Sequence, residues 1–160
     1  MSTHPPLEEV EEAVISAEKL LEKHGYKLPV KVSAEDLIKY FEAETPYPDI
    51  SLAEVLKEPL LVVHELVELS EIKKRGFKID KDIIVRYHEE IYEIHLKAAE
   101  IELEIALKEN RLDYVAKRIK AVESWLNDPL LPPWLKEDCK RLYTTFKQKI
   151  SRFQLSSPQS

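Results

Sequence analysis

Cysteine, glycine and long apolar runs are all scarce in this chain of 160 residues. The single cysteine, Cys139, excludes an internal disulfide and is typical of a reducing compartment. Because Gly25 and Gly76 are the only glycines, the chain has no glycine-rich loop of the kind that cradles phosphate groups. No apolar stretch approaches the roughly 20 residues that span a bilayer, and residues 1–6 lack the features of a signal peptide. We therefore expect a soluble, cytoplasmic protein.

Signals for β-strands are also scarce, since only residues 29–32 hint at an extended segment. Glu, Lys, Leu and Ile are plentiful, and several of the ten prolines stand at segment edges. These features predict an all-α fold, an antiparallel bundle of about five or six helices. The length suits a single domain over 1–160, with disordered tails at 1–5 and 155–160. Abundant Lys, Glu and Ile with few Asn, Gln, Cys and Met are typical of a thermophile.

Capping residues and helix breakers divide the chain into helical segments. Gly25 suits a left-handed helix end, and Ser51 begins a capping box with Glu54. Pro59 should kink or break the helix that contains it, because proline removes a backbone donor. Asp80 and Asn110 are expected to cap the helices that follow them. The expected helices cover residues 6–25, 33–43, 52–76, 80–110, 111–127 and 134–153.

The net charge of −6 argues against broad binding to nucleic acids. Acidic residues concentrate in 42–109, whereas 111–153 lean basic. The two parts either complement each other, within one chain or between two copies in a homo-oligomer, or the basic part forms a patch for phosphate or another anion. We expect a small-molecule substrate as partner, and no binding to nucleic acid or to a membrane.

The most apolar stretch, residues 59–69, carries His64, Glu65 and Glu68 in its middle. A helix that is apolar nearly all round is a buried helix. Charged residues are almost never fully buried without partners. His64 and Glu68 share a helix face because they are four residues apart. The stretch therefore predicts a buried polar cluster, and a metal ion is one partner that would satisfy it.

A short link at residues 76–80 predicts that the two central helices form an antiparallel hairpin. In that register Glu68 lies level with His88, and His64 lies level with Tyr92. His95 falls about one turn beyond Tyr92, still near His64. The polar residues of both helices should therefore converge.

The predicted metal site uses His64, Glu68 and one of His88 and His95, which are too far apart along one helix to bind the same ion. The other histidine would be an outer partner, a second site or a substrate contact. Imidazole with carboxylate suits Zn, Fe, Mn or Ni rather than Ca. Three protein ligands leave a position where the ion activates water, which predicts hydrolysis of a small molecule. Glu65 would then act as general base, or Glu65 and Tyr92 would orient the ligands.

Two resemblances bear on this prediction. The pattern His64-Glu65-x-x-Glu68 resembles the helix motif of zinc metallopeptidases, with Glu in place of the last His. Residues 65–76 resemble the motif helix of MazG-type all-α nucleoside triphosphate pyrophosphohydrolases, with Glu90 and Glu93 as the second half of the motif. This second resemblance implies Mg²⁺ held by the carboxylates, although His64 stands where that family usually has a further Glu. The non-enzymatic alternative is a structural or oligomerising helical protein whose His and Glu residues hydrogen-bond internally.

Overall fold

The computed structural model describes residues 4–47 and 50–156, with side chains through residue 153. This part of the chain is all-helical, with eight α-helices, one 3-10 helix and no strand, so the predicted fold class is confirmed. The elements are α1 (Leu7–Lys23), α2 (Ala34–Phe41), α3 (Leu52–Leu56), α4 (Pro59–Lys74), α5 (Ile83–Arg86), α6 (His88–Lys108), α7 (Leu112–Leu126), η1 (Pro133–Leu135) and α8 (Lys136–Ser156). The count exceeds the expected five or six because two expected helices are each broken.

The first break falls before Pro59, where a kink or break was expected. Helix α3 ends at Leu56 after one capped turn, in which the Ser51 side chain accepts from the Glu54 N–H. Pro59 then occupies the first turn of α4, where its missing N–H needs no partner. The Glu58 side chain caps α4 by accepting from the Leu60 N–H at 3.0 Å.

The second break, at Tyr87, was not expected. Tyr87 leaves helical geometry with φ −113° and ψ 40°, and its ring stacks on Phe77 with centroids 4.2 Å apart. The prediction of one helix from Asp80 to about residue 110 is therefore wrong. The short α5 intervenes, and the long α6 begins at His88. As a result, the connection between α4 and α6 is longer than the five residues expected.

Three helices end in a left-handed residue. Gly25, Gly76 and Asn110 have φ of 72°, 82° and 58°. At each, the next N–H reaches back to a carbonyl in the last turn, as Arg111 N does to Ala106 O at 2.9 Å. Asn110 therefore ends α6 and does not cap α7, whose N-cap residue is Arg111.

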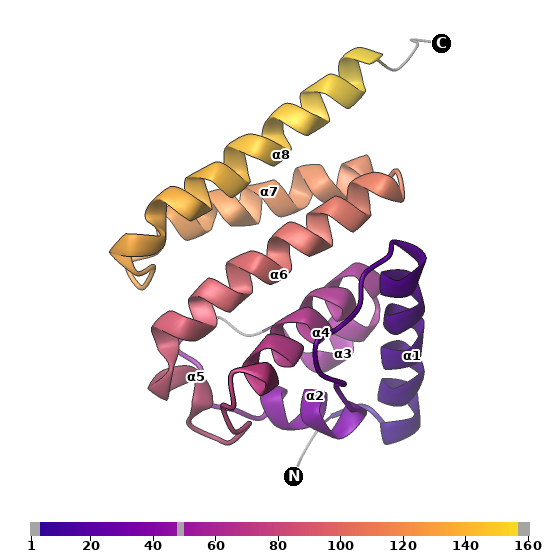
Figure 1. Ribbon diagram of the computed structural model, residues 1–160, viewed down its shortest axis with the longest axis vertical. Helices are drawn as coiled ribbons and strands as arrows, with labels where there is room; N and C mark the ends of the chain where they lie inside the picture. Colours follow the sequence, from indigo (N-terminus) through magenta and orange to yellow (C-terminus); the bar gives the residue numbers. More distant parts are fainter. Residues whose placement is uncertain (1–3, 48–49, 157–160) are drawn as a thin grey trace. The chain divides into compact units, whose positions relative to one another are not determined.

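Contacts between residues group the chain into two compact units, Met1–Glu102 and Leu103–Ser160, with α6 running through the boundary. In the first unit, α1, α2 and α3 all pack against α4 (Figure 1). Helix α4 is buried on nearly every side, as its apolar composition predicted. The polar side chains of α4 are therefore held inside the first unit.

The expected extended segment at residues 29–32 forms no strand. The hydroxyl of Ser70, buried on α4, instead accepts from the Val30 N–H at 2.9 Å and donates to the Val30 carbonyl at 2.7 Å. One side chain thus satisfies both backbone groups of Val30, so no neighbouring strand is needed.

In the second unit, α7 packs along α8. Val122 of α7 and Cys139 of α8 meet inside it, with the thiol sulfur 3.8 Å from the Val122 carbonyl oxygen. Burial raises the pKa of the Cys139 thiol to about 11, which suits the small apolar role expected of it. None of the helices in the described part of the chain has both the length and the apolar character that crossing a membrane requires.

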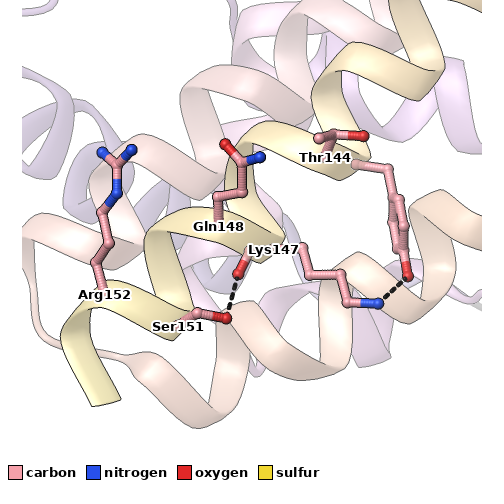
Figure 2. A pocket seen from close by; sticks show the side chains of 6 residues that line it. Thr144, Lys147, Gln148, Ser151 and Arg152 are labelled. Atoms are coloured by element: carbon pink, nitrogen blue, oxygen red, sulfur yellow. Dashed lines mark hydrogen bonds between the residues drawn. The ribbon is translucent and has the colours of Figure 1, made fainter. Parts of the chain in front are cut away.

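A groove of about 420 Å³ lies on α8, and Figure 2 shows its lining. It belongs to the part of the sequence that leans basic. The lining contains two cations and no carboxylate: Tyr143, Thr144, Lys147, Gln148, Ser151 and Arg152.

Candidate metal centre

Helix α4 supplies the first two members of the candidate site. His64 and Glu68 stand one turn apart, and only 3 % and 6 % of their side-chain surfaces are exposed. His64 Nε2 lies 3.3 Å from Glu68 Oε1. The predicted buried pair on one helix face is confirmed.

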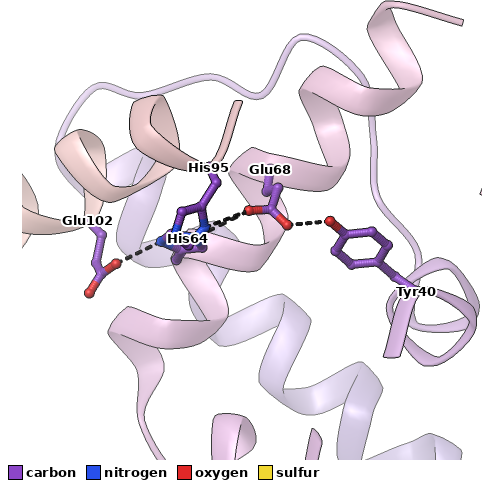
Figure 3. A network of polar contacts seen from close by, with 5 residues as sticks. All are labelled: Tyr40, His64, Glu68, His95 and Glu102. Carbon is purple, nitrogen blue, oxygen red and sulfur yellow. Dashed lines mark hydrogen bonds and ion pairs between the residues drawn. The ribbon is translucent and has the colours of Figure 1, made fainter. Parts of the chain in front are cut away.

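Helix α6 brings His95 and Glu102 to the same place, as Figure 3 shows. His64 meets Glu102 near one end of the contact between the helices, and Arg75 meets Glu93 toward the other, so α4 and α6 run antiparallel. All these residues belong to the first unit. The expectation that His95 lies near His64 is confirmed.

Three potential ligand atoms converge in this cluster. His95 Nδ1 lies 3.0 Å from His64 Nε2 and 3.1 Å from Glu68 Oε1, which closes a triangle with the 3.3 Å contact within α4. Two nitrogens and one oxygen bound about 2.0–2.1 Å from one ion lie about 3.0–3.4 Å from one another. His64, Glu68 and His95 therefore form a group that could hold a metal ion with little rearrangement.

Two further buried side chains fix the orientation of these ligands (Figure 3). His64 Nδ1 donates to Glu102 Oε1 at 2.8 Å, which leaves Nε2 directed into the triangle. The Tyr40 hydroxyl of α2 donates to Glu68 Oε2 at 2.5 Å, which leaves Oε1 directed into it. Metal-binding histidines and carboxylates are generally held by hydrogen bonds of this kind.

The two carboxylates also determine the charges of the cluster. Burial alone would lower the pKa of His64, but its hydrogen bonds to Glu102 and Glu68 outweigh burial and raise that pKa to about 10. Burial likewise opposes ionisation of Glu68, yet the bonds from His64 and His95 hold its pKa well below the usual range. Three such atoms this close need a proton or a metal ion between them: a proton on His64 Nε2, a proton on His95 Nδ1, or a metal ion.

The phenol of Tyr40 is kept neutral in this environment. Burial, followed by the negative charges of Glu68 and Glu65, raises its pKa well above the ordinary value. Tyr40 therefore retains its proton and acts as a hydrogen-bond donor to Glu68 over the usual pH range.

His95 is the most exposed member of the cluster. The side chain of His95 is 30 % exposed, whereas those of His64, Glu68 and Glu102 are 3 %, 6 % and 0 % exposed. Solvent therefore reaches the cluster at His95.

The structure places His88 beside Tyr47, with His88 Nδ1 2.9 Å from the Tyr47 hydroxyl. Glu68 contacts His95, which lies two turns further along α6 than the predicted partner His88. The register is shifted because the break at Tyr87 lengthens the connection between α4 and α6. Tyr92 is buried, and its ring lies edge-on to both His88 and His95.

The carboxylates named by the pyrophosphohydrolase resemblance do not form one group. Among residues 4–47 and 50–156, the group of potential ligands is His64, Glu68 and His95, without Glu65, Glu90 or Glu93. Glu93 instead lies 2.7 Å from the Arg75 guanidinium. The half-buried Glu65 faces the neighbourhood of Tyr40, whose pKa its charge raises.

Sequence reasoning missed Tyr40 and Glu102. Glu102 lies seven residues after His95, so the two share a face of α6, and it stands in an apolar run. That spacing was a usable signal for Glu102. Tyr40 had none, because it comes from a separate helix whose packing on α4 could not be read locally.

Comparisons of the chain with protein-family models, with curated proteins and with solved structures each find no match.

Proposed function

We propose that the protein binds one divalent transition-metal ion at His64, Glu68 and His95 and uses it to hydrolyse a small molecule. The observation that carries this proposal is the triangle of ligand atoms with sides of 3.0, 3.1 and 3.3 Å. Two imidazoles with one carboxylate suit Zn, Fe, Mn or Ni. Two of the three ligands belong to the buried helix α4, and hydrogen bonds to Glu102 and Tyr40 orient them.

Openness at His95 is what supports catalysis rather than a purely structural metal. A divalent ion with three protein ligands keeps a position for water and lowers the pKa of that water to about 7. Two helices supply the protein ligands, and the buried partners Glu102 and Tyr40 hold His64 and Glu68 from opposite ends of the cluster (Figure 3). The open position would therefore face the side where His95 is exposed.

Glu65 and Tyr92 are the proposed catalytic residues. Glu65 is half-buried one turn before Glu68 and would accept the proton of the attacking water. Tyr92 lies one turn before His95, with its ring 6.1 Å from the His95 ring, and would orient that ligand. Both roles can be tested separately from metal binding, because neither residue is in the triangle.

A second candidate function is a structural polar cluster without a metal. It is favoured by the hydrogen bonding of the cluster, since none of the buried side-chain N and O atoms in the described part of the chain lacks a partner. A proton on His64 would then satisfy Glu102 and Glu68 together. The two functions differ in whether chelator changes the stability of the protein.

Elemental analysis of protein purified without an affinity tag tests the first proposal. Wild type and the control His4→Ala, an exposed histidine outside the cluster, should each carry close to one equivalent of Zn, Mn, Fe or Ni. His95→Ala should lose it, because two ligands remain. This variant is preferred to His64→Ala since His95 is the partly exposed member, and the fold should tolerate the change.

Metal-loaded wild type should hydrolyse at least one of a panel of p-nitrophenyl esters, phosphates and anilides, with the activity lost after chelation and in Glu65→Gln. If neither wild type nor His4→Ala carries metal, and chelator leaves the melting temperature unchanged, the result would support the structural cluster instead. Bound metal without any hydrolysis of the panel would contradict the hydrolytic part of the proposal.

A further inference from the structure

A cluster of aromatic rings extends from His95 of the candidate site. The His95 ring, which is the exposed edge of the triangle, lies edge-on to the ring of Tyr92 at 6.1 Å between centroids. The Tyr92 ring in turn lies edge-on to His88 at 5.8 Å and to Tyr47 at 6.0 Å. The rings form a continuous path away from the triangle.

The outer end of this path is partly open to solvent. Tyr47 and His88 are both half-buried, whereas Tyr92 beneath them is 5 % exposed. Their rings are stacked, with an interplanar angle of 24° and centroids 5.9 Å apart. The contact between the Tyr47 hydroxyl and His88 Nδ1, at 2.9 Å, keeps both rings in place. The pair is therefore a rigid, polar-edged aromatic surface.

Its distance from the site suits one small molecule. His88 and His95 lie two turns apart on α6, about 10 Å along the helix axis. A compound whose metal-binding group, linker and ring together span about 10 Å along α6 would reach Tyr47 and His88. Aromatic rings attract planar rings through offset or edge-on contacts worth about 0.5–1.5 kcal/mol beyond their buried area.

We propose that Tyr47 and His88 form a specificity subsite for a planar aromatic or heteroaromatic ring of the substrate. The hydrolysed group of the substrate would lie at the triangle, and the ring would lie beyond Tyr92. This inference rests on the proposed metal-dependent function. In this proposal His88 contacts the substrate and does not bind the metal. A substrate contact was one of the roles expected for the histidine that is not a ligand.

Two matched hydroxamates test the subsite on Co²⁺-loaded protein, since a hydroxamate binds an open metal position and shifts the visible spectrum. The probes are 4-phenylbutanohydroxamate and 4-cyclohexylbutanohydroxamate, which differ in the flatness of one ring. We expect the phenyl compound to bind about 2- to 10-fold more tightly to wild type. Tyr47→Leu and His88→Leu should each bring that ratio close to one.

The controls separate the subsite from the metal site. Acetohydroxamate, which has no ring, should bind wild type and both variants within a factor of two. Tyr26→Leu, a half-buried tyrosine outside the ring path, should keep the wild-type ratio. A ratio near one in wild type, or a ratio that both variants retain, overturns the subsite while the metal site stands. A protein that takes up no Co²⁺ refutes the proposed metal site, and the subsite with it.

Discussion

The buried cluster on α4 and α6 and the groove on α8 contain similar numbers of polar side chains but differ in how these side chains are held. In the cluster, each contact between helices joins residues far apart in sequence, such as His64 with Glu102. In the groove, two hydrogen bonds join residues four apart on the same helix: Lys147 Nζ donates to the Tyr143 hydroxyl, and Ser151 donates to the Lys147 carbonyl (Figure 2).

Burial and contacts between helices distinguish the candidate site from a polar surface. Side chains in the cluster point at one another from three helices and exclude most water, so their electrostatic interactions are strong. In the groove, Lys147 and Arg152 are exposed and their charges are screened by solvent. Three predictions test this contrast, in order of decreasing effect.

The largest effect is expected from His64→Ala. This change leaves the carboxylates of Glu68 and Glu102 buried without the imidazole between them. Removing one partner of a buried ionic pair costs about 3–5 kcal/mol. Urea unfolding of the chelator-treated variant and wild type should show a loss of that size, and a loss below about 1 kcal/mol would contradict the buried charged cluster.

A smaller effect is expected from Glu102→Gln, which keeps the volume and removes the charge that holds His64 Nδ1–H. Loss of a residue that hydrogen-bonds to a metal ligand typically lowers metal affinity 10- to 100-fold, and we expect a loss of about that size here. Competition with a chelating dye measures it. Glu71→Gln is the matched control, because Glu71 is a buried carboxylate of α4 that pairs with Lys97 outside the triangle. Equal effects of the two changes would contradict the assigned role of Glu102.

The smallest effect is expected from Tyr143→Phe, which makes on α8 the same chemical change that Tyr40→Phe makes in the cluster. Tyr40→Phe removes a hydrogen bond to a buried carboxylate, which should lower the free energy of unfolding by about 1.5–3 kcal/mol. Tyr143→Phe removes a contact with exposed Lys147 on α8, which should change it by less than about 0.5 kcal/mol. Thermal and urea unfolding measure both. Similar losses in the two variants would contradict the expectation that burial strengthens the hydrogen bonds of the cluster.

Much of the fold could be predicted because its signals are local. The capping pair Ser51 and Glu54, the glycine ends at Gly25 and Gly76, and the proline at the start of α4 all act within a few residues. The break at Tyr87 could not be predicted in this way. It depends on stacking of Tyr87 against Phe77, ten positions away and with no helical periodicity to reveal it.

The candidate site shows the same division. The pairing of His64 with Glu68 followed from four-residue spacing, and the convergence with His95 followed from an antiparallel hairpin. The position of His88 and the shift of register depended on the unexpected break before α6. Tyr40 belongs to α2, and tertiary packing alone determines which face of α2 contacts α4. Its contact with Glu68 could therefore not be predicted.

The origin of the ligands in sequence has a consequence for how the protein folds. His64 and Glu68 come together as soon as α4 forms, because they are four residues apart. His95 lies 27 residues after Glu68, so it arrives only when the intervening chain has reversed direction and its loop-closure entropy has been overcome. The complete triangle therefore requires that α4 and α6 have docked. Its formation reports that the first unit has reached its native topology, which a helical signal alone would not reveal.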